Sequence, residues 1–565
     1  MIFFLHQIKY AMKKITLLSI YAAFVTMAFA QTQVVITDED LGSGIYNWTP
    51  DKEYVLDGLV YLESGGILNI AAGTVIKGLE TPSSSDNASA LIITQGAKIK
   101  VNGTQSEPVI MTSELDDVND PNDLTSEDRS LWGGLIILGN ATIGNATSPA
   151  QIEGIPTDEI RAQYGGENDA DNSGSIKYLS IRHCGAELAP GNEINGLTLG
   201  GVGSETSLEY IEIFASSDDG VEFFGGTPNI KNLVLACNSD DSFDWDTGFR
   251  GKGQFWFVLQ DIDEADNGGE LDGAIPDGQT PYSNPTVYNV TMIGSGISAA
   301  AANPAALLFR DASGGTIANS IITSYNFYAI EVEDLPEASG IDSRQRMEYG
   351  DLNLKNNIWY EFGNGDGLVV GEMIRATADA EDPTCAFLIS HLTTNENTVV
   401  DPQLGEISRL TNGGLDPRPS ATGPAYTTSF ATSPGGFFTT VPYKGAFAAN
   451  ETNWMDNWTA LSEYGYLSET VGIDQLNILD VDIAVYPNPV TDIATLNVSL
   501  ANTEKVNITL VDIQGRVVAK IANSETLNAG YHTFTIQTEG LASGLYQVRV
   551  SSINGVSETK IIINK

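Results

Sequence analysis

Basic residues are scarce in this sequence. Its 565 residues include 28 Lys and Arg against 73 Asp and Glu, which gives a formal net charge of −45. A chain with this charge repels phosphate backbones and anionic membrane surfaces. We therefore exclude nucleic acid as a partner, and we expect polyanions to bind only where cations bridge them.

Cysteine and histidine are also rare. The three cysteines, Cys184, Cys237 and Cys385, are an odd number and do not form the disulfide framework of a small secreted domain. There are four histidines, and no two of them stand at the H-x-H or H-x-x-x-H spacing of a zinc site. The sequence therefore predicts free thiols at Cys184 and Cys237 and no zinc centre.

Long apolar runs are absent beyond residue 31, so no later segment reaches the roughly 18 apolar residues of a membrane-spanning helix. Residues 1–30 contain no acidic residue. Met12-Lys13-Lys14 precedes an apolar stretch from Ile15 to Met27, and Ala28-Phe29-Ala30 fits a cleavage site. These features predict a secretory signal peptide at residues 1–30 and a mature chain without a membrane span.

Glycine and proline, by contrast, are plentiful, with 57 Gly and 22 Pro, and the apolar runs are short and β-branched. Ile211, Leu233 and Phe255 lie 22 residues apart, and the residues two places further on repeat at the same interval. Near the start, Gly73 and Gly96 mark a similar repeat that is one residue longer. This period is too short for a βαβ unit and fits one turn of a parallel β-helix. An array of β-sandwiches is less favoured, because its strands would not keep a fixed register.

Three segments rich in glycine and acidic residues carry a family resemblance. They are LAPGNEINGLTLGG at residues 188–201, DDGVEFFGG at 218–226 and GGLDPRP at 413–419. Together with the repeats they resemble the pectin-lyase-like β-helices, and more narrowly a group of uncharacterised secreted bacterial proteins. The resemblance implies an all-β body at residues 31–465, a right-handed parallel β-helix of about 22–23 residues per turn. It implies no particular activity, because β-helices serve as lyases, hydrolases, adhesins and spacers.

The final segment, residues 481–565, has the character of a separate small domain. It contains VYPNP at residues 485–489, LVDIQGRVV at 510–518 and LASGLYQVRV at 541–550, and it ends on KIIINK. Several stretches alternate apolar and polar residues at the period of half-buried strands. The motifs and their order resemble the type A C-terminal sorting domain of the type IX secretion system.

This second resemblance implies a small Ig-like β-sandwich at residues 481–565, joined to the body by a linker at 466–480. It also implies the type IX secretion machinery as a partner. Together with the signal peptide, it implies transport through the periplasm to the outer cell surface or the medium.

Acidic residues repeat at the same interval as the apolar ones. Asp219, Asp241 and Asp263 lie 22 residues apart. Like charges on turns about 5 Å apart repel, so they need protonation, a basic partner or a bound cation. Arg250 and Lys252, which are close in sequence, are the candidate basic partners, and calcium at Asp219, Asp241 and Asp263 is the candidate cation. The whole candidate ladder consists of Asp218, Asp219, Glu222, Asp240, Asp241, Asp244, Asp246 and Asp263.

This ladder leaves several functions open. Its aspartates would serve the fold if they accept backbone N–H bonds at the corners. They would serve binding if they hold a polysaccharide or surface glycan. Paired acids would suit a glycoside hydrolase or, with calcium and a basic residue, a polysaccharide lyase. Because the G-H-G motif of β-helical polygalacturonases is absent, we favour a non-enzymatic protein for adhesion, glycan contact or surface coating.

Overall fold

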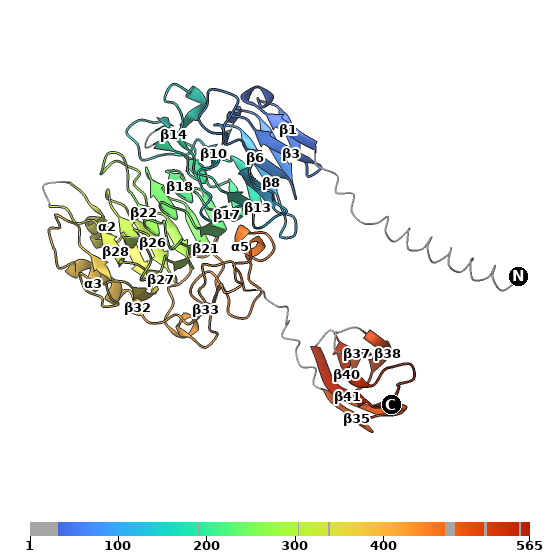
Figure 1. Cartoon of the computed structure of the whole chain (residues 1–565). Helices are drawn as coiled ribbons and strands as arrows, with labels where there is room; N and C mark the ends of the chain where they lie inside the picture. The colour runs from blue at the N-terminus through green and yellow to red at the C-terminus, as the bar shows by residue number, and fades with distance from the viewer. Residues whose placement is uncertain are drawn as a thin grey trace, which may run out of the picture. The chain divides into compact units, whose positions relative to one another are not determined.

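The computed structural model describes residues 32–189, 192–302, 304–336, 340–468, 481–512, 517–552 and 555–565 (Figure 1). Contacts divide the chain between Ser468 and Glu469 into two compact units, here called the body and the tail. The predicted signal peptide and most of the predicted linker lie outside the described residues. Nearly all regular structure in both units is β-structure, as the composition predicts.

The body is a parallel β-helix, which confirms the predicted fold class. Each turn contributes three strand segments, and each segment pairs in parallel with its equivalents in the neighbouring turns. We call the three resulting rows the first, second and third lane; the first two lie in one large sheet. The first lane consists of β2 (Ile45–Trp48), β5 (Ile67–Ala71), β8 (Lys98–Asn102), β13 (Gly174–Arg182), β17 (Ser207–Phe214), β19 (Asn229–Ala236), β21 (Lys252–Leu259), β23 (Thr286–Tyr288), β26 (Gly315–Ala318) and β29 (Leu352–Lys355).

The second and third lanes complete each turn. Strands β13, β17, β19 and β21 are long enough to span both the first and the second lane. The rest of the second lane is β1 (Thr32–Ile36), β3 (Lys52–Leu56), β6 (Val75–Gly78), β9 (Val109–Ser113), β24 (Thr291–Ile293), β27 (Ile321–Tyr325), β30 (Ile358–Phe362) and β32 (Thr398–Val399). The third lane is β4 (Leu59–Leu62), β7 (Ala90–Ile93), β10 (Leu135–Leu138), β16 (Leu197–Gly200), β18 (Val221–Phe224), β20 (Phe243–Asp246), β22 (Gly269–Leu271), β25 (Ala305–Phe309), β28 (Tyr328–Val332) and β31 (Ile374–Arg375).

Short elements lie in the loops and in the segment after the last turn. None of the helices in the described part of the chain has the length and apolar character needed to cross a bilayer. These elements are η2 (Asp38–Asp40), β11 (Ala150–Gln151), η3 (Ile160–Ala162), β12 (Gln163–Tyr164), β14 (Glu187–Ala189), β15 (Asn192–Glu193), α2 (Ser343–Tyr349), α3 (Ala386–Thr394), β33 (Leu404–Glu406), β34 (Asp416–Pro419), α4 (Pro424–Thr427) and α5 (Ala460–Glu463).

A single left-handed residue makes the corner between the first and second lanes from β13 onward. Each of these residues has a φ between 53° and 60°, a region that non-glycine residues rarely occupy. Asparagine tolerates it best, and it fills four of the seven positions. The corner residues are Tyr178, Tyr210, Asn232, Phe255, Asn289, Asn319 and Asn356.

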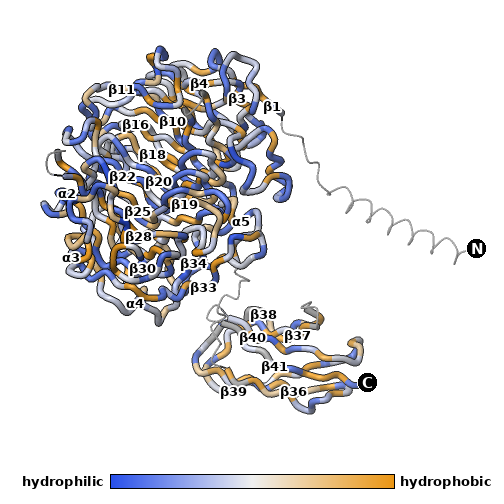
Figure 2. The backbone as a smooth tube through the Cα atoms, turned by 60° about the vertical axis from the view of Figure 1, so that its left-hand side comes forward, coloured by the Kyte–Doolittle hydropathy of each residue, from blue (hydrophilic) through white to orange (hydrophobic). Residues whose placement is uncertain are grey.

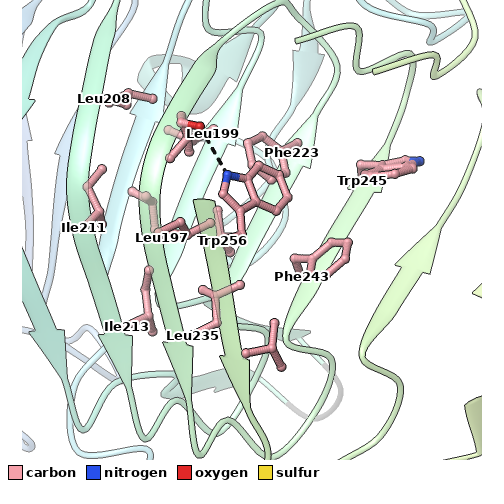
Figure 3. Packing of buried hydrophobic residues seen from close by; sticks show 14 of the residues in the cluster. Leu197, Leu199, Leu208, Ile211, Ile213, Phe223, Leu235, Phe243, Trp245 and Trp256 are labelled. Atoms are coloured by element: carbon pink, nitrogen blue, oxygen red, sulfur yellow. Dashed lines mark hydrogen bonds between the residues drawn. The ribbon is translucent and has the colours of Figure 1, made fainter. Parts of the chain in front are cut away.

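Inward side chains from the three lanes stack into one apolar core (Figure 3). Ile211 lies beside Leu233, and Leu233 lies beside Trp256, whose Nε1 donates to the Ile230 carbonyl at 3.1 Å. The predicted partner of Leu233, Phe255, is wrong by one residue, because one extra residue enters between β20 and β21 and lengthens this turn. Each apolar side chain buried in such a core contributes roughly 1.5–3 kcal/mol.

The length of a turn varies more than the repeats predict. Val221 pairs with Phe243 at the predicted interval, whereas Leu135 pairs with Leu197, which lies much further along the chain. The early repeat is also different, because Leu68 pairs with Ile99 and not with its predicted equivalent, Leu91. Loops inserted at the two corners that flank the third lane account for these differences. The predicted period therefore holds only for turns without insertions.

The segment after the last turn folds back over the outer face of the large sheet. Phe257 of β21 contacts the ring of Phe447 edge-on, and Trp458 packs against Tyr178 and Tyr210. The backbone N–H groups of Ala460 and Leu461, where α5 begins, donate to the buried carboxylate of Glu212. This second apolar cluster fixes the segment to the middle turns of the β-helix.

The tail consists of two antiparallel sheets that share one apolar core. Figure 2 shows hydrophobic stretches along its strands, as their alternating sequences predict. One sheet contains β35 (Val481–Tyr486), β36 (Ile493–Leu500) and β39 (Gly530–Gln537). The other contains β37 (Glu504–Asp512), β38 (Val517–Leu527), β40 (Gly544–Ser552) and β41 (Gly555–Ile563).

All three cysteines are free and buried, as predicted for Cys184 and Cys237. Burial raises the pKa of the Cys184 thiol to about 12 and that of Cys385 to about 11. Thiolates, which are the reactive form, are therefore scarce at neutral pH. We expect no reaction of the native protein with a disulfide reagent, and reaction of all three thiols after unfolding without reductant. A lower count would reveal a disulfide and contradict the structure.

Candidate functional site

Two rows of acidic residues form at the corner that precedes the third lane. The amide of Gly196 donates to the Asp219 carbonyl, and that of Gly220 donates to the Asp241 carbonyl. Asp219 and Asp241 therefore occupy equivalent places on successive turns, as predicted. The Asp241 amide also donates to Asp219 Oδ1 at 3.0 Å, so the Asp219 side chain also stabilises the backbone of the corner on the next turn. Asp218 and Asp240 form the neighbouring row, one residue earlier.

A third row lies on the outer face of the third lane itself. Glu222 pairs in register with Asp244, and Asp244 pairs with Glu270 on the following turn. Phe223 and Trp245, which follow Glu222 and Asp244 in sequence, point into the core, as the alternation predicts. The strand register thus brings the outer carboxylates to one side of the molecule.

The three rows converge on one cavity of about 280 Å³, which we call the acidic pocket. Ten of its lining residues are acidic and one is basic. Seven of the eight residues predicted for the ladder are among them. The lining consists of Glu153, Asn195, Asp218, Asp219, Glu222, Phe224, Asp240, Asp241, Asp244, Asp246, Glu270, Asp272 and Arg310.

Burial makes the charged forms of these carboxylates unfavourable. It raises the pKa of Asp218 and Asp272 to about 7 and that of Asp240 and Asp246 to about 6. For Asp218 and Asp240, neighbouring carboxylates raise it further. The pKa values of the most buried members also lie well above the ordinary range, because of burial first and neighbouring carboxylates second. These members are Asp219, Glu222, Asp241 and Asp244.

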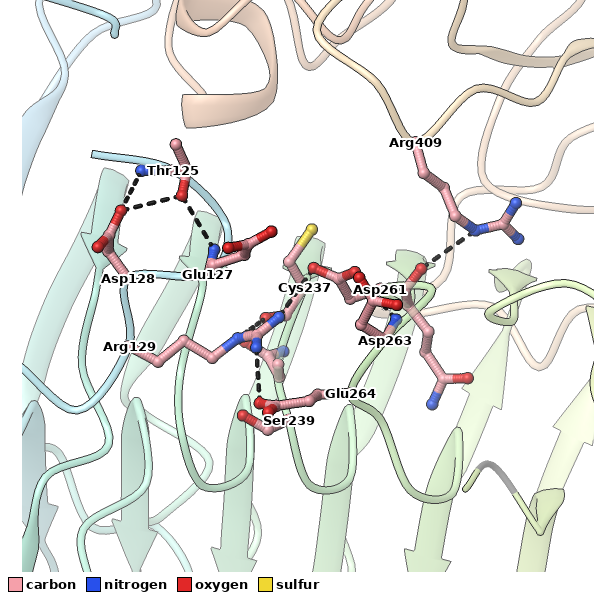
Figure 4. Close-up of polar contacts among 12 residues, drawn as sticks. Thr125, Glu127, Asp128, Arg129, Cys237, Ser239, Asp261, Asp263, Glu264 and Arg409 are labelled. Carbon is pink, nitrogen blue, oxygen red and sulfur yellow. Dashed lines mark hydrogen bonds and ion pairs between the residues drawn. The ribbon is translucent and has the colours of Figure 1, made fainter. Parts of the chain in front are cut away.

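Asp263 does not belong to this ladder, and its prediction is corrected. The Ser242 amide donates to the Asn267 carbonyl, so Asn267 is the equivalent of Asp241 on the next turn. That turn carries extra residues, and Asp263 lies within them, exposed to solvent. Figure 4 shows Asp263 beside Asp261, on the side of the body that Arg129 occupies. Asp266 follows Asp240 in the outer row instead, because its amide donates to the Asp240 carbonyl.

The predicted basic partners also lie elsewhere. Arg250 Nη1 binds Asp169 at 2.9 Å, and this contact lowers the pKa of Asp169 to about 2. Lys252 is exposed at the start of β21. Arg310, which follows β25, takes their place: its Nε lies 2.8 Å from Asp272 Oδ1, and its Nη2 contacts Glu270. The guanidinium comes from a later turn, so proximity in sequence could not identify it.

Two sets of three carboxylates have the geometry to hold a cation. Asp218, Asp219 and Asp240 each offer one oxygen, and these oxygens all lie within 4.8 Å of one another. Asp240, Asp241 and Asp266 do the same, so Asp240 belongs to both sets. Calcium takes about six to eight oxygen ligands at roughly 2.3–2.6 Å, a spacing that such groups can meet with small rotations.

Several buried oxygens in and around the acidic pocket have no hydrogen-bond partner within the described residues. They include Oδ1 of Asp241, whose side chain is 2% exposed, and Oδ1 of Asn195, which is 1% exposed. Oδ1 of Asp244 and of Asp266 are also without a partner. Buried oxygens that lack a donor are costly, so these atoms call for a proton, a water molecule or a cation.

Sequence reasoning missed several polar residues of the lining. Asn195 was visible in principle, because Asn195-Gly196 precedes β16 as Asp219-Gly220 precedes β18. The others lie within or after insertions that shift the register, so their spacing gave no signal. The missed residues are Glu153, Asn195, Glu270, Asp272 and Arg310.

Comparisons with known proteins agree with this architecture. A comparison with curated proteins found no match. The tail, at residues 484–564, matches the secretion system C-terminal sorting domain, so the protein is a type IX cargo that is secreted or displayed on the cell surface. Residues 43–372, more than half of the chain, match the pectate-lyase like beta helix domain. The chain therefore belongs to the pectate-lyase-like β-helix family.

Proposed function

We propose that this exported protein contacts glycans at the cell surface through calcium bound in the acidic pocket. The observation that carries the proposal is the excess of carboxylates, ten against one guanidinium, around a cavity that is open to solvent. Adhesion and surface coating are the roles that such contact would serve.

A cation is needed because the other remedies for repulsion are insufficient at neutral pH. Arg310 pairs with Glu270 and Asp272 and leaves the remaining carboxylates without a basic partner in the lining. Protonation satisfies the buried members, but Asp240 and Asp246, with pKa values of about 6, lose their protons at neutral pH. A hard divalent cation neutralises several carboxylates at once and accepts their free oxygens as ligands.

A bound cation would also create a place for sugar. Three carboxylates fill only part of the coordination shell of calcium, and the remaining positions would face the open side of the pocket. Sugar hydroxyls and uronate carboxylates are oxygen ligands that can occupy such positions. This explains how a strongly acidic protein could contact acidic glycans, which its own charge would otherwise repel.

Calcium titration by calorimetry tests the proposal directly. We expect the wild-type protein to bind calcium, Asp241→Asn to bind it at least about 10-fold more weakly, and the exposed variant Asp263→Asn to match the wild type. A glycan array probed with calcium and then with chelator should give signals that disappear on chelation. The proposal fails if millimolar calcium produces no binding heat, or if array signals are unchanged by chelator.

A second candidate, glycoside hydrolysis, rests on the pKa of Asp218. With a pKa of about 7, about half of the Asp218 side chains keep a proton at neutral pH, and a general acid requires that protonated form. A lyase is less well supported, because Arg310 is the basic residue of the lining. Although burial lowers the pKa of Arg310, the hydrogen bond and charge of Asp272 raise it overall, so Arg310 would not release its proton to act as a base. Release of reducing ends from a polysaccharide panel, lost in Asp218→Asn, would establish hydrolysis.

A further inference from the structure

A second cavity, of about 700 Å³, lies beside the loops that follow β21 and β24. It falls within the roughly 300–1,000 Å³ range of small-molecule sites. We call it the Arg409 cavity. Its lining consists of Ile262, Asp263, Ser295, Gly296, Ile297, Ser298, Ala299, Ala300, Ser324, Glu361, Ile407 and Arg409. None of these residues lines the acidic pocket.

Arg409 is unusual among the arginines of this acidic chain. Its Nε donates to the Gln260 carbonyl at 3.2 Å (Figure 4), and its Nη2 donates to the Gly294 carbonyl. Among the described residues no carboxylate lies within ion-pair distance of it, and burial lowers its pKa. The two carbonyls fix the guanidinium plane and leave Nη1 beside Gly296, in the wall of the cavity.

Further polar groups line the same wall. Ser295 is 1% exposed, and its hydroxyl has no hydrogen-bond partner within the described residues. Glu361 accepts a hydrogen bond from Ser324 at 2.5 Å, and Asp263 lies exposed at the rim. The cavity therefore offers donors at Arg409 and Ser295 and acceptors at Glu361 and Asp263.

The walls also present apolar surface to solvent. Ile262 and Ile297 are 41% and 46% exposed, although most aliphatic side chains of the body are buried. A ligand with both C–H faces and hydroxyl groups would cover these isoleucines while it satisfies the polar groups beside them. Small-molecule sites combine such apolar walls with a few placed polar groups.

Charge decides which ligand class fits. One guanidinium and two carboxylates line the Arg409 cavity, so an anion gains one attraction and meets two repulsions. A cation gains two attractions, but the guanidinium repels it and it cannot accept a hydrogen bond from Arg409 or Ser295. A neutral sugar avoids both penalties, because each hydroxyl can accept from Arg409 or Ser295 and donate to Glu361 or Asp263.

We propose that the Arg409 cavity binds a neutral sugar of a surface or environmental glycan, without any metal. The inference rests on the proposed role in glycan contact and assigns a ligand class to a site separate from the acidic pocket. The two sites differ in their need for calcium, so they can be tested apart.

Ligand-observed NMR on the mature protein in the presence of chelator tests the inference. The probes are neutral disaccharides of glucose, galactose and mannose, with digalacturonate as the acidic comparison. We expect saturation transfer to at least one neutral disaccharide, and roughly 5–10-fold weaker binding in Ser295→Ala, which loses a hydroxyl, and in Glu361→Gln, which replaces an acceptor oxygen with an NH2 donor. Asp263→Asn, at an exposed position, should weaken binding without any change in melting temperature.

Asp241→Asn serves as the matched control, because it alters the acidic pocket alone. It should bind the neutral disaccharide as well as the wild type does. The inference is overturned if no neutral disaccharide binds, if only digalacturonate binds, or if the variants of the Arg409 cavity bind like the wild type while remaining folded. If the wild-type protein binds sugar but does not bind calcium, the result contradicts the calcium site in the acidic pocket and supports the inference about the Arg409 cavity.

Discussion

In the presence of chelator, the body should melt at a lower temperature at pH 8 than at pH 5, and millimolar calcium should reverse this loss. The reason is the raised pKa of the pocket carboxylates, about 7 for Asp218 and Asp272 and about 6 for Asp240 and Asp246. The ordinary pKa of an aspartate is 3.8, so between about pH 4 and pH 7 the native state binds more protons than the unfolded state. Stability therefore falls as pH rises through that window.

Calcium should offset the loss because it binds the native state alone. At a hundredfold excess over its dissociation constant, a ligand adds about 2.7 kcal/mol to the free energy of unfolding. For a body of this size we expect a rise of about 3–6 °C in melting temperature at pH 8. The rise should shrink at pH 5, where protons compete for the same oxygens.

Asp241→Asn separates this account from a purely structural role. Asn195 and Asn267 already occupy equivalent corner positions, so asparagine suits the backbone there. With chelator at pH 8 the variant should melt at or above the wild-type temperature, because one repelling charge is gone, and its response to calcium should be small. Asp263→Asn should behave as the wild type. If calcium and chelator leave the melting temperature of the wild type unchanged, the aspartates are corner elements only.

Removal of residues 481–565 should trap the protein in the periplasm. The tail has its own apolar core, and the body buries its core without it, so the truncated body should remain folded. Immunoblots of periplasm, outer membrane and medium measure the distribution, and the melting curve of the periplasmic body reports its folding.

A reporter fused to residues 481–565 provides the complementary control. If the tail is sufficient as a sorting signal, the reporter should reach the surface or the medium in cells with an intact type IX system and stay in the periplasm without it. Truncated protein found in the medium at the wild-type level would contradict the assignment of the tail.

The part of the acidic pocket that sequence could predict is the part without insertions. Between β18 and β20 the turn keeps the predicted length, so Asp219 and Asp241, like Glu222 and Asp244, could be aligned by counting. From β20 to β22 the interval is longer, because extra residues enter the corner before Asn267. Counting therefore selected Asp263 and overlooked Asp266 and Glu270.

The ion pairs of the acidic pocket were harder to predict from the sequence than the register of its strands. Arg250 lies close to the ladder in sequence, yet its side chain turns to the loop that holds Asp169. The basic side chain that does reach the pocket belongs to Arg310, which follows β25. It lies a full turn beyond its partner Asp272, and a long loop separates the two residues in the sequence. No local pattern in the sequence indicates a loop of that length, so ion pairs between turns require the structure. The fold class and the tail, which rest on repeated patterns, could be predicted.

The left-handed corner between the first and second lanes has a consequence for how this scaffold can be modified. From β13 onward this corner has a single left-handed residue in every turn, so its constant length keeps the two lanes in the same register. In these turns all additional chain length enters at the two corners beside the third lane, where the loops around the acidic pocket and the Arg409 cavity arise. New loops can thus be grafted beside the third lane without a change in the register of the first two lanes. A residue added at Asn232, by contrast, would shift the register of the turns that follow it.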